Sequence, residues 1–218
     1  MPAGEEVSLA VPELSFEERK TRLVKAATQV FARKGFAASN KEIAAEAGIT
    51  AAALYWYFPS KEDLLWAVID QHWPDPAQIR ASLWAARDLP PRAVLPRLVD
   101  GVATSFFNEE MRPLITVLVQ ESIRNPTIAK VYEERFVASI AGALTAYFAY
   151  QIERGVFKPG KAEVYVPCFM GPLAIAGVFK FVLNQGWLAR VEVREIIQTA
   201  VDLFLTGILT TQEETRHG

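Results

Sequence analysis

The residue types that usually carry catalysis are sparse in this chain and are not grouped. The chain has two histidines, His72 and His217, and one cysteine, Cys168, in 218 residues. No segment has the histidine and cysteine spacing of a zinc site, and no glycine-rich loop suits a phosphate group. Cys168 lies in an apolar run without a nearby histidine that would activate its thiol. The sequence therefore predicts no enzyme, no metal site and no cofactor.

Two short helices joined by a tight turn are predicted within residues 39–61, SNKEIAAEAGITAAALYWYFPSK. Ser39 and Glu42 fit the capping box, in which both side chains accept hydrogen bonds from amides at a helix start. Gly48 ends this helix, because glycine readily adopts the left-handed conformation of a helix terminus. Thr50 is a candidate cap for the following helix. Helix, glycine turn and helix form the plan of the helix-turn-helix motif, whose second helix enters the major groove of DNA.

The side chains expected to face outward from this hairpin are small at the start of the second helix and then aromatic with polar tips. Small side chains let a helix enter a groove deeply, and a methyl group can contact the thymine methyl. Hydroxyl groups, an ammonium group and helix-start amides suit phosphate oxygens. The predicted DNA-binding residues are Ser39, Thr50, Ala51, Ala53, Tyr55, Trp56, Tyr57 and Lys61. From the spacing alone, the alternative is a helical hairpin whose aromatic residues belong to the core.

Residues 23–65 resemble the DNA-binding region of the tetracycline-repressor-like (TetR) family of bacterial transcriptional regulators. The matching segments are AATQVFARKGF (26–36), EIAAEAGIT (42–50) and LYWYFPSKEDLL (54–65). The resemblance implies a homodimer that binds a palindromic operator with one recognition helix per half-site. It also implies repression of transcription until a small ligand releases the DNA, although the sequence leaves activation open.

Three features depart from the family pattern. The link between Gly35 and Ile43 is one residue shorter, and Asn40 stands where an apolar residue is common. Residues 51–53 are all alanine, so the side chains that pair bidentately with base edges are missing there. We therefore expect recognition to rely on few base contacts and on DNA shape. The alternative function is a helical small-molecule-binding protein that has lost DNA binding, and salt-dependent DNA retention separates the two.

Charge is divided along the chain. Residues 16–61 carry eight Lys or Arg and four Asp or Glu, whereas the rest of the chain carries 15 basic and 21 acidic residues. This division suits a protein that contacts phosphate at one end only. The single cysteine indicates a reducing compartment, and the N-terminus lacks the pattern of a signal peptide. The longest apolar run, residues 164–179, is shorter than the roughly 20 residues of a membrane span. We expect a cytoplasmic protein without membrane association.

Three segments are expected along the chain. Residues 1–14 contain proline, glycine and glutamate without Lys or Arg, and are predicted to form a flexible tail. Residues 15–73 are predicted to form the helix-turn-helix DNA-binding domain, because prolines at 74 and 76 then interrupt the helical pattern. Residues 74–218 are predicted to form a helical bundle for ligand binding and dimerisation. No run shows the alternation of a strand, so the predicted fold class is all-α.

The larger predicted domain is rich in aromatic residues, which can line an apolar pocket between helices. A few polar residues in apolar surroundings are candidates for orienting a ligand. The predicted ligand-binding residues are Trp84, Phe106, Gln120, Arg124, Phe136, Tyr147, Phe169 and Asn184. For any single aromatic residue, the alternative is a place in the core. The expected effector is a small apolar or aromatic compound.

The last two predicted helices, 162–185 and 193–211, are apolar over more than one face. Such helices need cover on all sides, and a second copy of the chain is one source of it. The resemblance implies that these two helices form a four-helix bundle in a homodimer. The residues predicted at this interface are Ala174, Val178, Phe181, Ile197, Val201, Phe204 and Ile208.

Overall fold

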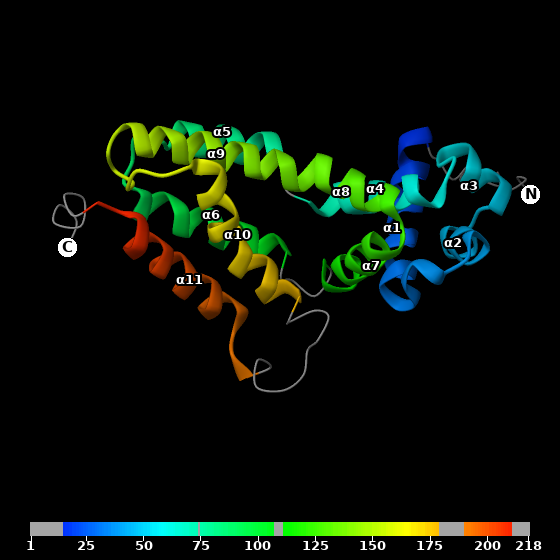
Figure 1. The fold of residues 1–218 in the computed structure, drawn as a ribbon. Helices are drawn as coiled ribbons and strands as arrows, with labels where there is room; N and C mark the ends of the chain where they lie inside the picture. Colours follow the sequence, from blue (N-terminus) through cyan, green and yellow to red (C-terminus); the bar gives the residue numbers. More distant parts are fainter. Residues whose placement is uncertain (1–14, 74, 107–110, 179–189, 211–218) are drawn as a thin grey trace, which may run out of the picture.

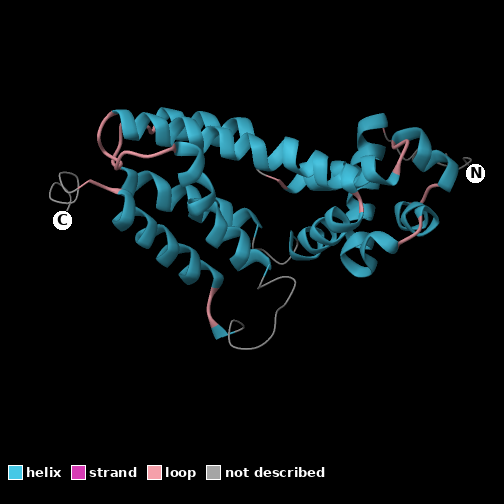
Figure 2. Cartoon of the chain, viewed as in Figure 1, coloured by secondary structure: helices cyan, strands magenta, loops and turns pink. Residues whose placement is uncertain are grey.

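The computed structural model describes residues 15–73, 75–106, 111–178 and 190–210. Within these ranges the chain is helical without any strand, and the one extended contact is an isolated bridge between Phe157 and Leu209. Figure 2 shows helices joined by short loops. The all-α fold class is therefore confirmed.

The helices follow one another in the order drawn in Figure 1. They are α1 (Phe16–Lys34), α2 (Asn40–Ala47), α3 (Ala51–Tyr57), α4 (Lys61–His72), α5 (Pro76–Ala85), α6 (Pro91–Phe106), α7 (Met111–Arg124), α8 (Pro126–Tyr132), α9 (Ala138–Glu153), α10 (Ala162–Gly177) and α11 (Val193–Ile208). A 3-10 turn, Gly35–Ala37, follows α1, and a π-helical turn, Glu133–Val137, joins α8 to α9.

Serine side chains set the starts of α1, α2 and α4. Ser15, Ser39 and Ser60 each accept a hydrogen bond from the amide three residues later, where a carboxylate bonds back to the serine amide. Each pair satisfies two of the amides that a helix start leaves without a partner. The capping box predicted at Ser39 is thus confirmed. Gly48 ends α2 with φ 70 and ψ 33, the left-handed conformation expected for it.

A first hydrophobic core holds α1 to α4 together and continues into α7 and α8. Its buried residues from the N-terminal helices are Leu23, Val24, Ala26, Ala27, Val30, Phe31, Ala38, Ile43, Ala44, Ala47, Leu54, Phe58, Leu64, Leu65, Trp66, Val68 and Ile69. Later segments add Met111, Leu114, Val117, Leu118, Ile128 and Phe136. A β-carbon on Gly35 would lie 3.9 Å from Val117, so α7 passes close to the end of α1.

A second hydrophobic core lies in the body formed by α5, α6, α9, α10 and α11 (Figure 1). Helix α9 packs against α5 and α10, and α11 packs against α6 and α10. Tyr147, Phe148 and Phe157 are fully buried at its centre. No helix within the described ranges is both long enough and apolar enough to span a membrane.

Candidate DNA-binding and ligand-binding sites

One face of α3 packs on the first core, and the opposite face is exposed and available to DNA. Leu54 is fully buried in the first core, and Phe58, directly after α3, is 4% exposed. The Thr50 hydroxyl accepts a hydrogen bond from the amide of Ala53 at 3.1 Å and caps the helix. On the free face, Ala52 is exposed, and Tyr55 and Trp56 are 52% and 71% exposed.

The other predicted contact residues on this motif are half-buried or have a polar group bonded within the protein. Ala51, Ala53 and Tyr57 are half-buried. Ser39 is exposed, but its hydroxyl caps α2. Ala52 was not among the predicted contact residues, although it belongs to the same run of alanines as Ala51 and Ala53.

A hydrogen bond between the two helices of the motif fixes the hydroxyl of Tyr55. The Asn40 Nδ2 group, at the first position of α2, donates to Tyr55 Oη at 2.8 Å. Because the tyrosine oxygen accepts this bond, its own proton is left to be donated elsewhere. An exposed hydroxyl that donates suits a phosphate oxygen. The only sequence sign of this pair was the departure of Asn40 from the apolar family pattern.

Three aromatic rings join the end of α3 to the start of α1. The Phe16 ring stacks on Tyr57 with centroids 5.0 Å apart and meets the edge of Trp56 at 5.3 Å. Trp56 and Tyr57 are themselves in edge contact at 5.1 Å. The rings therefore place an exposed aromatic surface beside the free face of α3.

Basic side chains near the motif are bound within the protein to different degrees. The Lys61 ammonium donates to the carbonyls of Phe36 and Ala38, and it lies 4.5 Å above the Phe36 ring centroid. Burial lowers the pKa of Lys61. Lys61, predicted to contact phosphate, is thus tied to the loop that follows α1.

The exposed side chain of Arg22 lies over the turn between α2 and α3. One of its guanidinium nitrogens is 3.2 Å from the position that a β-carbon on Gly48 would occupy.

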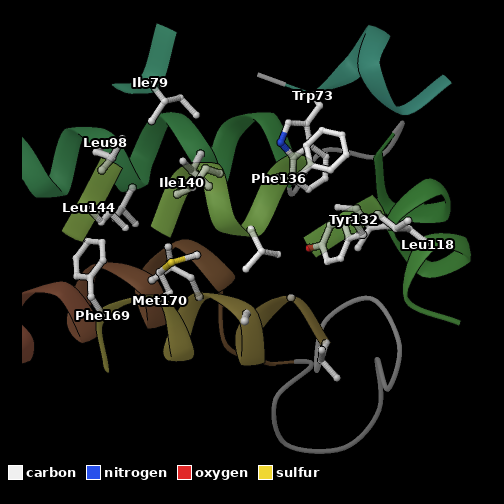
Figure 3. Close-up of a pocket in the computed structure, with 18 of the residues that line it drawn as sticks. Trp73, Ile79, Leu98, Leu118, Tyr132, Phe136, Ile140, Leu144, Phe169 and Met170 are labelled. Atoms are coloured by element: carbon white, nitrogen blue, oxygen red, sulfur yellow. The ribbon is translucent and has the colours of Figure 1, made fainter. Parts of the chain in front are cut away.

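A cavity of about 250 Å³ lies between the two cores. Figure 3 shows α9 on one side of it and α10 on the other, with the end of α4 and the region of α7 and Tyr132 closing one end. The residues that line it are Trp73, Ile79, Leu98, Val99, Val102, Ile115, Leu118, Val119, Tyr132, Phe136, Val137, Ile140, Leu144, Phe169, Met170, Leu173, Ala174, Gly177 and Val178. No ionised side chain is among these described residues.

The structure brings two of the predicted ligand-binding residues, Phe136 and Phe169, to this cavity. Tyr147 is fully buried in the second core, where burial raises the pKa of its hydroxyl. Trp84 is 46% exposed and lies under the guanidinium of Arg87, at 4.8 Å.

The remaining predicted ligand-binding residues do not line the described cavity wall. Gln120 and Arg124 have exposed side chains on α7. The side chain of Phe106 and the whole of Asn184 lie outside the described residues.

Most of the predicted interface residues pack inside one protomer. Ile197 and Val201 are 1% exposed and Ile208 is 5% exposed, all in the second core. Phe204 contacts the rings of Phe148 and Phe169, at 5.6 and 5.2 Å.

The other predicted interface residues lie on or beyond α10. Ala174 and Val178 have exposed side chains that also border the cavity, and Phe181 lies outside the described residues. Besides Val178, which directly follows α10, the large exposed apolar side chains of α10 and α11 are Val164, Ile175 and Leu203.

A helix-turn-helix motif with an open second helix, joined to a helical body that contains an apolar cavity, defines a DNA-binding transcriptional regulator. Comparison with protein families agrees. Residues 23–68 match the family of bacterial regulatory proteins called tetR, and residues 93–207 match the C-terminal domain of AefR-like transcriptional repressors. The second match covers more than half of the chain, and the chain belongs to the TetR family of regulators.

The match to an individual relative covers a smaller part of the chain than the family models do. The uncharacterized HTH-type transcriptional regulator YerO of Bacillus subtilis (strain 168) is 32% identical over 114 residues, which are 49% of this chain and 37% of that protein. The chain thus matches little more than a third of the length of this relative.

Solved structures share the fold. A TetR-family regulator from Mesorhizobium loti MAFF303099 is 20% identical with a TM-score of 0.71, over 91% of this chain and 100% of that chain. SmeT of Stenotrophomonas maltophilia is 14% identical with a TM-score of 0.69, over 89% of this chain and 92% of that chain.

Proposed function

We propose that this chain is a repressor that binds a palindromic operator as a homodimer and is released by a small apolar or aromatic ligand. The observation that carries the proposal is the free face of α3, where Ala52, Tyr55 and Trp56 are exposed while Leu54 anchors the helix. A helix that is anchored on one side and open on the other can enter the major groove.

The composition of that face favours shape and methyl recognition of DNA. Ala52 offers a methyl group for thymine, and Thr50 is exposed at the helix start. Tyr55 supplies a donor for phosphate, with its hydroxyl set by Asn40. With few direct base contacts, much of the sequence preference falls to DNA deformability.

A second copy of the chain is the proposed cover for the outer face of α10 and α11. A row at helical spacing runs along α10 through Val164, Cys168, Gly171 and Ile175 to Val178, directly after the helix. All of these residues but the half-buried Gly171 are exposed. Leu203 of α11 is 70% exposed. These small and apolar groups permit close helix packing, and a two-fold dimer would present two recognition helices to two half-sites.

Ligand release requires that the ligand bind the DNA-free arrangement more tightly than the DNA-bound one. The cavity suits such a role because its wall includes Trp73, directly after α4, and residues of α7 that pack on the first core. A ligand there touches segments that also hold the DNA-binding helices. SmeT, which shares the fold, is the repressor of a multidrug efflux pump.

The experiment that tests the proposal is selection of random-sequence DNA by the purified chain at about 0.15 M salt, the physiological range. We expect an enriched palindrome whose half-sites are about one helical turn apart or a multiple of it. A variant with Ala52→Glu, which places a negative charge on the free face, should enrich nothing. A matched variant, Ala32→Glu on the exposed side of α1, should select the same palindrome.

A second function is favoured by one observation, the lack of a bidentate base-reading side chain at the start of α3. In this case the chain binds a small molecule without binding DNA. DNA retention that falls steeply with salt would exclude it, because phosphate contacts release counterions. Equal elution of wild type and Ala52→Glu from DNA at every salt concentration would support it.

A further inference from the structure

The wall of the cavity differs between its two ends. At one end the rings of Trp73, Tyr132 and Phe136 meet, with Trp73 and Phe136 centroids 4.4 Å apart and Tyr132 at 6.0 Å from each. At the other end, Figure 3 places Leu98, Leu144, Phe169 and Met170. The described lining is therefore aromatic towards α4 and α8, and largely aliphatic towards the second core.

Tyr132 brings a hydroxyl group to the aromatic end. Figure 3 shows this hydroxyl directed into the cavity, and no hydrogen-bond partner for it is present among the described residues. Burial raises the pKa of Tyr132, so the group stays protonated at neutral pH and can donate as well as accept. A partly buried hydroxyl facing an apolar space is a natural anchor for one polar group of a ligand.

The same wall disfavours an ionised ligand. A charge moved into this cavity would lose part of its hydration, and the described lining has no opposite charge to compensate. The aromatic end does not form a cage for a cation either. Trp73 and Phe136 lie too close together, at 4.4 Å, to admit a group between their faces.

The volume limits the size of a ligand. The cavity between the described residues, at about 250 Å³, is small for a ligand pocket. Typical ligand pockets start at about 300 Å³. One ring with a short alkyl group fits this space, whereas a ligand with a large ionised head group does not.

We propose that the effector is a small neutral compound, mostly apolar, with one hydrogen-bonding group that Tyr132 binds. This inference rests on the proposed function, in which the cavity is the effector site. Tyr132 then determines specificity, since it distinguishes a hydroxylated compound from the hydrocarbon of the same shape.

Four probes with one skeleton test the inference by calorimetry on the full chain at pH 7.5, without DNA. They are 4-isopropylphenol, the hydrocarbon cumene, the anion 4-isopropylbenzoate and the cation trimethyl(4-isopropylphenyl)ammonium. We expect the phenol to bind about tenfold more tightly than cumene, which is the worth of one hydrogen bond in such a site. The anion and the cation should bind at least about 100-fold more weakly than the phenol.

Three variants test whether the probes bind in this cavity and against Tyr132. Tyr132→Phe keeps the ring, and it should reduce phenol affinity to the level of cumene while leaving cumene binding unchanged. The matched control Tyr165→Phe removes a hydroxyl that bonds to the carbonyl of Pro159, away from the cavity lining, and should change neither affinity. Ile140→Trp, which fills the cavity, should abolish binding of both probes while the variant keeps a cooperative thermal transition.

Tighter binding of either ion than of the phenol overturns the inference, and so does equal phenol affinity in wild type and Tyr132→Phe. Failure of all four probes to bind overturns it as well. A different result would contradict the proposed function. If the phenol binds as expected but does not release selected DNA, the inference of a neutral ligand bound by Tyr132 is supported, whereas ligand-controlled repression is contradicted.

Discussion

Asn40 and Tyr55 show how one side chain can set the chemistry of another at the DNA-binding surface. The asparagine amide donates to the tyrosine oxygen at 2.8 Å, and the tyrosine proton is thereby left for another acceptor. A tyrosine that is free to rotate would have to order its hydroxyl on binding, at a cost in entropy. The pair therefore prepares a phosphate donor before DNA arrives.

Replacement of Asn40 by Asp is expected to weaken operator binding about 10- to 100-fold, the worth of a hydrogen bond to a charged group. The carboxylate would accept the tyrosine proton and add a negative charge facing phosphate. Fluorescence anisotropy with the selected operator at fixed salt measures the change. Because Asp is favourable in the first turn of a helix, the thermal stability of the variant should not fall. Unchanged affinity would show that the tyrosine hydroxyl makes no phosphate contact.

Lys61 is expected to contribute to stability through the loop after α1. Its ammonium donates to the carbonyls of Phe36 and Ala38, so Lys61→Met leaves both acceptors without this partner. We expect the free energy of unfolding to fall by about 1–2 kcal/mol, measured by urea denaturation. Lys41→Met, at an exposed position of α2, is the matched control and should change it by less than about 0.5 kcal/mol. Loss of DNA affinity without loss of stability would make Lys61 a phosphate contact alone.

At the scale of elements, α4 and the π-helical turn Glu133–Val137 form one contact next to the cavity. Trp66 and Asp70 of α4 and Trp73 after it share a face at i, i+4 and i+7. The ring of Phe136 lies 6.3 Å from that of Trp66 and 4.4 Å from that of Trp73. Arg135 pairs with Asp70 at 3.1 Å. A π-helical turn inside a helix is rare and often marks a functional site, and this one presents Phe136 to the cavity.

The two side chains of this contact should differ greatly in their effect on stability. Phe136 is 3% exposed, and Phe136→Ala should lower the free energy of unfolding by about 3–5 kcal/mol. The Arg135–Asp70 pair is about half exposed, and Arg135→Ala should cost less than about 1 kcal/mol. Denaturant titrations of the two variants give the comparison. A larger cost for Arg135 than for Phe136 would contradict the view that apolar packing joins α4 to the turn.

The capping box of α2 should respond to acid. The hydrogen bond from Lys34 and those from Ser39 hold the pKa of Glu42 at about 2, below the ordinary value of 4.5. The unfolded chain therefore binds this proton more readily, and the contribution of Glu42 to stability is present above pH 4.5 and lost as the pH falls towards 2. Carbon-13 NMR of the carboxyl group should show the low midpoint, and Lys34→Ala should raise it. A midpoint that Lys34→Ala leaves unchanged would assign the shift to Ser39 alone.

The sequence predicted the helices of the DNA-binding motif well because their ends carry local signals. Ser39, Gly48 and Thr50 each act on amides or carbonyls within a few residues. The cavity was predicted poorly, because an aliphatic residue lining a cavity has the same chemistry as one in a core. Phe136 and Phe169 were found as aromatic residues, whereas Trp73 and Tyr132 reach the cavity through packing between distant segments. The π-helical turn has no signal in the apolar periodicity, which continues through it.

At the scale of the whole molecule, the outer face of α10 and α11 should decide the assembly. Leu203→Glu places a charge where a second copy is proposed to pack, at a side chain that is 70% exposed in one protomer. Light scattering should show a dimer for wild type and a monomer for this variant. Ile123→Glu, at an 82% exposed position of α7, is the matched control and should stay dimeric. A dimer that persists in Leu203→Glu places the interface on another surface.

The extension of the first core into α7 and α8 has a consequence for any attempt to isolate the DNA-reading part. A fragment ending near residue 73 would lack Leu114, Val117 and Leu118, which the intact chain buries among the residues of α1 to α4. Each such side chain contributes about 1.5–3 kcal/mol when fully buried. The fragment would expose an apolar patch and lose much of its marginal stability. Nearly 40 residues separate the end of that fragment from the segment that completes its core, so truncation is expected to produce aggregation in place of a minimal DNA-binding module.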